Sequence, residues 1–236
     1  MKKNHKITCL ITSGGTKVPI DMVRSITNMS RGTFGSQIAD SALEHFWDVT
    51  FLHAVDSKLP EHYWDDCQLA PFHPVPFVTF DDYHKALMSE LKKKPDVIIL
   101  AAAVSDYGVE NYVDGKIRSD GELVIRLKPL PKLIAAVRKH CPKAVLCGFK
   151  LLVNSTCKQL LDACINSINK NDCDVVVGND LRDIKNNDHK LLIVRRLGKT
   201  NFLSLTFTKK MAENERRTLA SYVVAMCNEK YEVKNQ

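Results

Sequence analysis

The chain alternates short apolar runs with longer segments in which apolar residues recur every three or four positions. The runs predict buried strands, and the run at 97–104 is apolar almost throughout, as in a strand covered on both faces. Strands are predicted at residues 7–12, 49–53, 97–104, 144–149 and 173–177. Helices are predicted at residues 33–46, 81–94, 131–140, 155–170 and 209–227. Because strands alternate with helices of this length, the pattern predicts an α/β fold with a doubly wound, mostly parallel, Rossmann-like sheet.

Two segments interrupt this alternation. Residues 59–77 are rich in proline and aromatic side chains and predict a long irregular connection. Residues 107–127 leave the sheet, apart from a strand predicted at 122–127, and we expect this excursion to be a lid or a dimerisation arm. The chain has no internal repeat or low-complexity tract, so we predict one domain over residues 1–236.

The last part of the chain predicts a hairpin before the closing helix. Residues 190–194 and 201–206 have the composition of strands and flank Gly198-Lys199, which is a hairpin signal. The tail, residues 229–236, is expected to fray.

Composition places the chain among ordinary globular proteins. Of its 236 residues, 44% are hydrophobic and 26% are charged, which excludes disordered, collagen-like and coiled-coil classes. No run approaches the roughly 18 apolar residues that a membrane-spanning helix needs. The apolar run behind the basic residues 1–6 is also shorter than a signal-peptide core of about 7–15 residues. We therefore expect a cytoplasmic protein with no membrane partner.

The formal net charge is +7, from 34 lysines and arginines against 27 acidic residues. These basic residues are spread along the chain without a long run, which favours a solvated surface over a nucleic-acid groove. The excess also suits small phosphorylated ligands, and we expect no nucleic-acid partner.

Cysteine and histidine spacing gives no sign of a metal centre. None of the eight cysteines forms a C-x-x-C pair, and the eight histidines form no H-E-x-x-H motif. Several cysteines lie inside apolar runs, where a thiol behaves as a small hydrophobic group. We predict free thiols and no metal site built from side chains.

In a doubly wound sheet, ligands bind beyond the carboxyl ends of the strands. The first of four segments predicted there is TSGGT (12–16), in which Gly14 and Gly15 would let backbone N–H groups approach a phosphate. A tight turn explains the two glycines equally well. The next helix starts about 17 residues later and the spacing is not G-x-G-x-x-G, which argues against an ordinary NAD site.

The second segment, RSITNMSRGTFG (24–35), combines two arginines, an asparagine and two glycines at a predicted helix N-terminus. Such a set can bind an anion. It can equally be a capped helix, with Ser30 near its start and Gly35 allowing close packing on the sheet. The segment alone does not separate the two readings.

The third segment, AAAVSDY (101–107), puts small side chains at the end of a buried strand and Asp106 at its rim. Asp106 could meet a ribose hydroxyl, an amine or a metal ion, or could cap a helix. The fourth set is GKIRS (115–119), PKLI (131–134) and GFK (148–150), in which Lys116 and Lys132 are mobile cations able to meet a polyphosphate. Each lysine taken alone is better explained as a solvated surface charge, and Phe149 could be core or could flank a base.

Together and in this order, these segments resemble the phosphopantothenate–cysteine ligase family of coenzyme A biosynthesis, in its stand-alone bacterial form. Each stretch alone is weak, whereas the ordered set is highly specific. The matching stretches are ITSGGTKVPID (11–21), VRSITNMSRGTFG (23–35), AAAVSDY (101–107), GKIRS (115–119), LPKLI (130–134), GFKLL (148–152) and VVVGNDL (175–181).

The resemblance implies a reaction in two steps. The carboxylate of 4′-phosphopantothenate attacks the α-phosphorus of a nucleoside triphosphate, giving an acyl-nucleotide and pyrophosphate. The amine of L-cysteine then displaces the nucleotide to form the amide. By the resemblance we expect CTP rather than ATP, Mg²⁺ on the triphosphate, and a homodimer.

The resemblance also implies roles for single residues. Asn28 matches an asparagine that acts on the acyl-nucleotide, and Arg24, four residues earlier, matches an arginine near the same site. Ser30 and Gly32 are expected at the substrate phosphate. The residues expected to bind the nucleotide are Gly14, Gly15, Ala103, Asp106, Lys116, Pro131, Lys132, Leu133, Ile134, Phe149 and Lys170.

The chain departs from the family pattern at three positions. Asn166 replaces a lysine that is common four residues before Lys170, Gly178 replaces an alanine, and Thr33 stands where many relatives have lysine. Asn166 bears on how tightly the triphosphate is held.

Two other functions share parts of this pattern. A Rossmann-type NAD(P)-dependent oxidoreductase has the same fold class, but the chain lacks its glycine motif and the acidic residue after the second strand. A non-catalytic nucleotide- or nucleic-acid-binding module would use the positive charge and would release no pyrophosphate.

Overall fold

The computed structural model describes residues 6–61, 70–185, 190–214 and 218–235, without the side chains of residues 213 and 214. Its centre is an eight-stranded sheet with the order β12-β11-β10-β9-β6-β1-β4-β5. The strands are β1 (Thr8–Ser13), β4 (Asp48–Ala54), β5 (Phe72–Phe77), β6 (Val97–Leu100), β9 (Val145–Leu152), β10 (Val175–Asp180), β11 (Lys190–Arg196) and β12 (Phe202–Thr208).

The six strands from β5 to β10 are parallel, and β11 and β12 continue the sheet antiparallel. Chain order runs outward from β1 to β5 in one direction and from β6 to β10 in the other, so the direction of winding reverses between β1 and β6. The carboxyl end of such a reversal is where doubly wound folds bind ligands. The predicted α/β fold is therefore confirmed, and the hairpin predicted around Gly198-Lys199 is the pair β11–β12.

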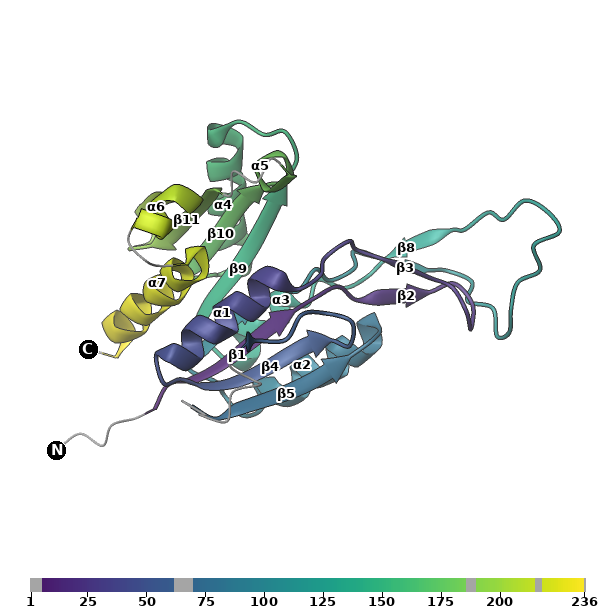
Figure 1. Cartoon of the computed structure of the whole chain (residues 1–236), viewed down its shortest axis with the longest axis horizontal. Helices are drawn as coiled ribbons and strands as arrows, with labels where there is room; N and C mark the ends of the chain where they lie inside the picture. Colours follow the sequence, from purple (N-terminus) through teal and green to yellow (C-terminus); the bar gives the residue numbers. More distant parts are fainter. Residues whose placement is uncertain (1–5, 62–69, 186–189, 215–217, 236) are drawn as a thin grey trace.

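Helices cover both faces of the sheet (Figure 1). The helices α1 (Thr33–Glu44) and α7 (Leu219–Lys234) pack on one face and on each other. The other face carries α2 (Phe80–Leu91), α3 (Ile134–His140) and α4 (Cys157–Asn171). Two short helices, α5 (Leu181–Lys185) and α6 (Lys209–Asn214), follow β10 and β12. The strands in the middle of the sheet are buried on both faces, which explains why their sequences lack a polar alternation.

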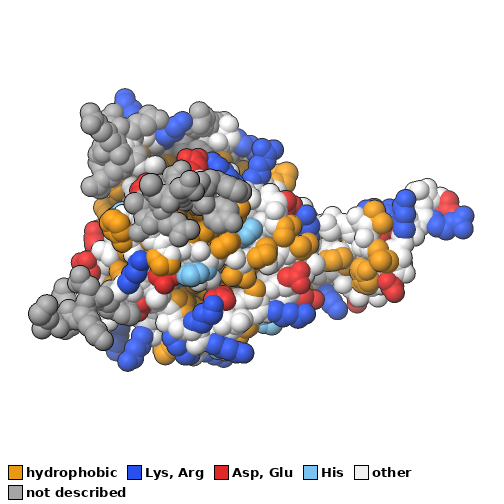
Figure 2. Space-filling view, turned by 60° about the horizontal axis from the view of Figure 1, so that its bottom comes forward, with side chains coloured by type: hydrophobic (Ala, Val, Ile, Leu, Met, Phe, Trp, Pro, Cys, Tyr) orange, Lys and Arg blue, Asp and Glu red, His pale blue; other side chains and the backbone are white. Residues whose placement is uncertain are grey.

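Two narrow ribbons project beyond the carboxyl edge of the sheet (Figure 1). One pairs β2 (Lys17–Pro19) with β3 (Ser25–Thr27), and the other pairs β7 (Tyr107–Val109) with β8 (Leu127–Pro129). We call residues 17–27 and 107–129 the arm. Figure 2 shows apolar side chains on its surface, and the most exposed include Met22, Val23 and Val124.

Two sequence predictions in the connections were wrong. Part of the expected irregular stretch 59–77 is the edge strand β5, and residues 62–69 lie outside the described part. Pro74 and Pro76 hid it from the pattern, yet prolines are tolerated on an edge strand where the missing N–H would face solvent. Residues 122–126 are not a strand, because the pairing with β7 begins only at Leu127.

The end of the chain also differs from expectation. The helix predicted at 209–227 is two helices, with Thr218 capping α7 by accepting the N–H of Ser221. Residues 229–234 do not fray, since α7 continues to Lys234, and residue 236 lies outside the described ranges. The ammonium of Lys234 lies 2.7 Å from the buried Asp174 carboxylate, and this ion pair holds the last turn on the sheet.

None of the helices in the described residues is both long and apolar enough to cross a membrane. The seven cysteines within the described ranges are free thiols, and Cys67 lies outside them.

Candidate functional site

A cavity of about 260 Å³ opens at the carboxyl ends of β6 and β9, between the start of α3 and the end of α4. The sequence-predicted nucleotide residues that line it are Asp106, Pro131, Lys132, Leu133, Ile134, Phe149 and Lys170. These residues come from four separate segments, which the fold gathers beside β6, one of the two strands between which the winding reverses. A second cavity, of about 230 Å³, lies at the amino ends of β1 and β4, and no predicted site residue lines it.

The segment after β6 is fixed in place by the end of β1. The N–H of Ala103 donates to the Gly14 carbonyl at 2.8 Å, and the N–H of Ser105 donates to Thr16 Oγ1 at 2.9 Å. Ala102 donates to the buried Thr12 Oγ1 at 3.2 Å. This ladder continues the strand pairing beyond β6 and presents Asp106 at the cavity wall without a following helix.

Charge in the cavity is predominantly positive. Lys132, Lys150 and Lys170 line it, and Asp106 is the one carboxylate among the described residues that do so. The ammonium of Lys132 contacts the Asp106 carboxylate across the opening, although both side chains are largely exposed. An exposed pair of this kind contributes little to stability, so either partner is free to meet a ligand.

The turn after β1 packs tightly. Gly14 has φ +84°, and a Cβ there would lie 2.6 Å from the Cβ of Ala54. Gly15 approaches the backbone of Asn28, whose carbonyl would be 3.1 Å from its Cβ. The tight-turn explanation of the two glycines is therefore supported, and neither residue lines the cavity.

Helix α1 begins at the end of the arm. Its N-cap is Gly32, with φ +73° and no side-chain cap, so the interpretation in which Ser30 caps the helix was wrong. Ser30 Oγ accepts only the N–H of Gly32, at 3.4 Å. The first N–H groups of α1 thus have no side-chain partner, which is the condition for anion binding. The close packing predicted for Gly35 is confirmed, because a Cβ there would overlap Ser13.

Asn28 lies where the arm joins the sheet. Its exposed side chain donates from Nδ2 to the Ala103 carbonyl at 2.8 Å, next to the cavity wall formed by Ala102 and Asp106. The fold therefore brings together Asn28, Ala103 and Gly15, three of the predicted residues, although they are far apart in the sequence.

Arg24 lies on the arm and is held by Asp21. Its Nε and Nη2 donate to Asp21 Oδ2 at 3.0 and 2.6 Å, and Nη2 also donates to the Ile117 carbonyl at 2.7 Å. Oδ2 of Asp21 accepts the Ile117 N–H at 3.1 Å. We call Asp21, Arg24 and Ile117 the clasp. The Arg24 guanidinium and several backbone N–H groups hold the pKa of the buried Asp21 carboxyl well below its usual range.

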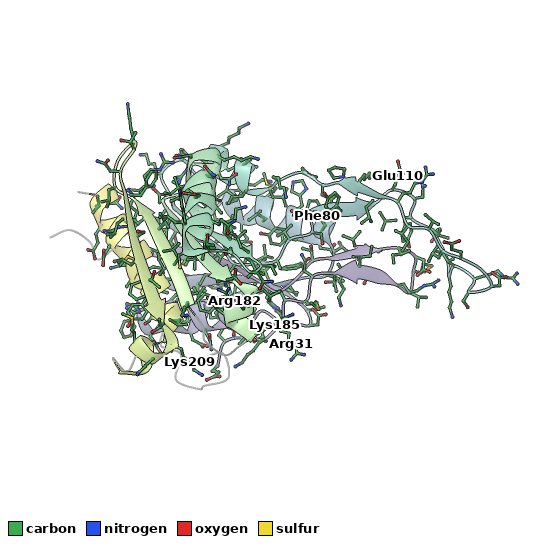
Figure 3. The ribbon with its side chains drawn as sticks, turned by 90° about the horizontal axis from the view of Figure 1, so that it is seen from above. Arg31, Phe80, Glu110, Arg182, Lys185 and Lys209 are labelled. Atoms are coloured by element: carbon green, nitrogen blue, oxygen red, sulfur yellow. The ribbon has the colours of Figure 1, made fainter. Side chains whose placement is uncertain are left out.

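Lys116 lies beside the clasp and not in the cavity. The carbonyl of its neighbour Gly115 accepts the Met22 N–H at 3.0 Å, so both residues flanking Lys116 are tied to the other ribbon. Viewed from above, the arm, with Glu110 labelled, extends away from the sheet (Figure 3). The Lys116 side chain is exposed.

Sequence reasoning missed three residues that the structure brings forward. Lys150 and Ser105 line the cavity, and Asp21 anchors the arm. Lys150 follows Phe149 at the end of a predicted strand, so its position alone could have identified it. Asp21 gives no such signal, because its partner Ile117 lies 96 residues further along the chain.

The departures from the family pattern have clear positions. Asn166 is exposed on α4 and is not among the described residues that line the cavity. A Cβ on Gly178 would lie 2.6 Å from Cys164 Sγ, so an alanine there needs a wider spacing of α4 from β10. Thr33 is exposed in the first turn of α1.

The family described as the DNA/pantothenate metabolism flavoprotein C-terminal domain matches residues 4–222. The chain is 34% identical to the coenzyme A biosynthesis bifunctional protein CoaBC of Thermococcus kodakarensis, over 89% of this chain and 48% of that protein. It is 28% identical to the phosphopantothenate–cysteine ligase of Mus musculus, over 75% of this chain and 73% of that one. The chain thus spans about half the length of the first of these relatives.

Solved structures agree with this relationship. The DNA/pantothenate metabolism flavoprotein of Streptococcus pneumoniae superposes with a TM-score of 0.71 at 29% identity, covering 89% of this chain and 96% of that chain. A Cab2 mutant in complex with phosphopantothenate–cysteine shares the fold, with a TM-score of 0.78 at 23% identity over 97% of this chain and 87% of that chain. The resemblance found in the sequence motifs is confirmed: the chain belongs to the family of the DNA/pantothenate metabolism flavoprotein C-terminal domain.

Proposed function

We propose that this chain is a phosphopantothenate–cysteine ligase of coenzyme A biosynthesis. It joins 4′-phosphopantothenate and L-cysteine through an acyl-nucleotide and releases pyrophosphate and a nucleoside monophosphate. Membership of the family and the ligase named among its relatives support this function. The observation that carries it is the cavity, because the residues expected to bind the nucleotide converge there from distant parts of the sequence.

The cavity is the proposed nucleotide site. Phe149 and the segment 131–134 supply apolar walls for the base, Asp106 accepts from the ribose hydroxyls, and Lys132 and Lys170 meet the phosphates. Binding would replace the contact between Lys132 and Asp106 with ligand contacts. We expect CTP to be preferred over ATP.

Mg²⁺ is expected to arrive with the triphosphate. No group of three or more His, Cys, Asp or Glu within the described ranges could hold a metal by itself. Mg²⁺ commonly takes one or two carboxylates and completes its shell with phosphates and water. Because Asp106 is assigned to the ribose hydroxyls, the phosphates and water would supply most of the ligands of the ion. When bound, the ion would neutralise charge on the phosphates, while Lys132 and Lys170 orient the triphosphate group.

Asn28 is the proposed catalytic residue of the second step. As cysteine attacks the acyl carbonyl, negative charge develops on the carbonyl oxygen, and a preorganised amide N–H stabilises it. Asn28 already directs Nδ2 toward a carbonyl oxygen, that of Ala103 at 2.8 Å, and its second amide hydrogen is available. Gly14 and Gly15 hold the backbone beside it.

The phosphate of 4′-phosphopantothenate is proposed to bind at Ser30 and Gly32, where the uncapped N-terminus of α1 offers backbone N–H groups. Arg24 is proposed to support this region from the arm, through the clasp.

The arm is proposed to join two copies of the chain in a homodimer. It exposes apolar side chains on a projecting ribbon, as an association surface does. Because Lys116 lies on the arm away from its own cavity, its proposed contact with the nucleotide is made in the cavity of the second copy.

The oxidoreductase alternative is not favoured. A dinucleotide would approach the turn after β1, but Gly14 packs against Ala54 and Ser57, and neither Gly14 nor Gly15 is among the described residues that line the cavity.

The test is a pyrophosphate-release assay with 4′-phosphopantothenate and L-cysteine, run with CTP and with ATP. Release that needs 4′-phosphopantothenate, together with formation of 4′-phosphopantothenoylcysteine, is the expected result. Binding of a nicotinamide cofactor without pyrophosphate release would contradict the proposal.

A further inference from the structure

Lys150 lies at the carboxyl end of β9, on the face of the sheet that α3 and α4 cover. Alternate residues of a strand share a face, and the two residues before Lys150 on this face, Leu146 and Gly148, are buried. Lys150 itself is exposed and lines the cavity. The strand therefore places a cation at the point where the core ends and the cavity begins.

Two glycines bring the neighbouring helices close to the sheet at this point. Gly178 is paired in register with Lys150, and a Cβ on it would lie 2.6 Å from Cys164 Sγ of α4. A Cβ on Gly148 would lie 3.3 Å from Ile134 Cδ1, at the start of α3. Both helices thus pack against backbone, and the cavity lined by Lys150 opens between the start of α3 and the end of α4. Burial raises the pKa of the Cys164 thiol on α4, and the nearby positive charge of Lys150 acts in the opposite direction.

Two cations of the cavity have no acidic partner. Lys132 contacts Asp106. No acidic side chain in the described ranges lies within ion-pair distance of Lys150 or Lys170. One turn before Lys170, α4 carries the uncharged Asn166, so the second unpaired charge comes from the strand and not from the helix.

Unpaired like charges around a hollow raise the local positive potential and attract a polyanion. A lysine suits a phosphate chain in particular, because its ammonium is a mobile point charge that needs no fixed fork geometry. A single exposed lysine has a simpler explanation, which is a solvated surface charge. Lys150 differs from such a residue in lying on the cavity wall with a second unpaired cation, Lys170.

We propose that Lys150 binds the phosphate chain of the nucleoside triphosphate, as a second cation beside Lys170. This assignment rests on the proposed function, which makes the cavity a nucleotide site. It adds a binding residue whose expected effect is on nucleotide affinity, because an exposed lysine without fixed geometry attracts the phosphate chain as soon as the nucleotide is bound.

The test compares Lys150→Met, Lys150→Arg and Lys158→Met. Methionine keeps an apolar stem and removes the charge, and arginine restores the charge. Lys158 is an exposed lysine of the neighbouring helix α4 and is not among the described residues that line the cavity. Calorimetry measures binding of inorganic tripolyphosphate and of CTP and ATP. Steady-state kinetics measures KM for the nucleotide and for cysteine.

For Lys150→Met we expect a roughly tenfold loss of affinity for tripolyphosphate and nucleotide, the lower end of the range for a charge-assisted contact. The nucleotide KM should rise by the same factor, with kcat and the cysteine KM unchanged. Lys150→Arg should recover most of the affinity, and Lys158→Met should match the wild type.

Wild-type affinity for both ligands in Lys150→Met would overturn the proposal and leave Lys150 a solvated surface charge. Weaker nucleotide binding with unchanged tripolyphosphate binding would also overturn it, since the contact would then not be to phosphates. A wild-type chain that binds neither ligand would instead refute the proposed function, and this assignment with it.

Discussion

In the cavity, Lys150 and Lys170 have no acidic partner among the described residues, whereas in the clasp the charges of Asp21 and Arg24 meet at 2.6 Å. The two lysine side chains are exposed, and the Asp21 side chain is fully buried. An unpaired charge can exchange water for a ligand at little structural cost, while a buried paired charge is already committed to its neighbours. The comparison predicts that substitutions in the cavity change ligand affinity without changing the stability of the fold. Substitutions in the clasp should instead change the local stability of the arm.

The largest effect is expected at Asn28, where the two regions meet. Asn28→Asp replaces an amide donor with a carboxylate acceptor, so the cysteine step should slow by roughly 10²–10³. Formation of the acyl-nucleotide should continue, so pyrophosphate is released about once per site and the intermediate accumulates. Quenched reactions analysed by mass spectrometry measure it. Asn111→Asp, an exposed change on the arm, is the control. Equal slowing of both steps would reduce Asn28 to a residue that positions the arm.

The next effect is expected at Asp106. Asp106→Asn should raise the nucleotide KM by roughly tenfold to a hundredfold, because a charge-assisted contact is lost. The melting temperature should stay unchanged, since the contact with Lys132 is exposed. Asp120→Asn removes an exposed ion pair with Arg118 and serves as the matched control. A lower melting temperature with normal KM would place Asp106 with the clasp.

A smaller, structural effect is expected at Asp21. Asn in its place turns one acceptor oxygen into an N–H donor. In one orientation of the amide this donor faces the Arg24 guanidinium and the Ile117 N–H, and in the other it faces the backbone N–H groups of Val23 and Arg24. Hydrogen exchange should show the Ile117 amide opening roughly tenfold faster. Asp56→Asn, which breaks an exposed ion pair with Lys17, is the control and should leave that amide protected. Unchanged protection in Asp21→Asn would show that the clasp does not hold the arm.

The stability of the sheet beside the cavity should depend on pH through the carboxyl of Asp180. Asp180 accepts the N–H and the hydroxyl of Ser155 and the N–H groups of Arg182 and Asn154, and these bonds lower its pKa to about 2 from an ordinary value of 3.8. Its stabilisation is therefore present above about pH 4 and is lost as the pH falls toward 2. In acid titrations followed by circular dichroism, Asp180→Asn should be less stable at pH 6 and should depend less on pH in this window. A parallel loss in both proteins would contradict the assignment.

The smallest effect is expected from the exposed thiol of Cys157. The attacking groups of the proposed reaction are the substrate carboxylate and the substrate amine, so Cys157→Ser should keep normal kinetics. A folded Cys157→Ser protein without activity would contradict that mechanism.

The parallel sheet was predictable because each of its central strands has a recognisable local sequence pattern. Runs such as 97–104 are apolar on both faces, and the helices between them repeat at the helical period. The edge strand β5 was not predicted, because Pro74 and Pro76 are compatible with a strand only at the edge of a sheet, and the sequence does not show that position. The ordered end of α7 was not predicted for a different reason. The partner that holds Lys234 is Asp174, which lies 60 residues earlier in the sequence.

The candidate site divides in the same way. Asp106, Phe149 and Lys170 follow recognisable motifs, and the strand order brings them into one cavity. The clasp could not be predicted, because the burial of Asp21 depends on which residues the second ribbon places against it. Motif order predicts which residues gather at the sheet, whereas side-chain partners on the arm depend on long-range geometry.

The two prolines of β5 also bear on how copies of this chain can meet. An open edge strand normally invites another chain to add a strand by backbone hydrogen bonding, which is a common route to aggregation. Pro74 and Pro76 are two residues apart, so both missing donors fall on the same side of β5, away from its partner β4. A neighbouring copy therefore finds no continuous ladder at this edge. This edge of the sheet is therefore a poor surface for strand addition, which leaves the arm as the surface for the proposed association.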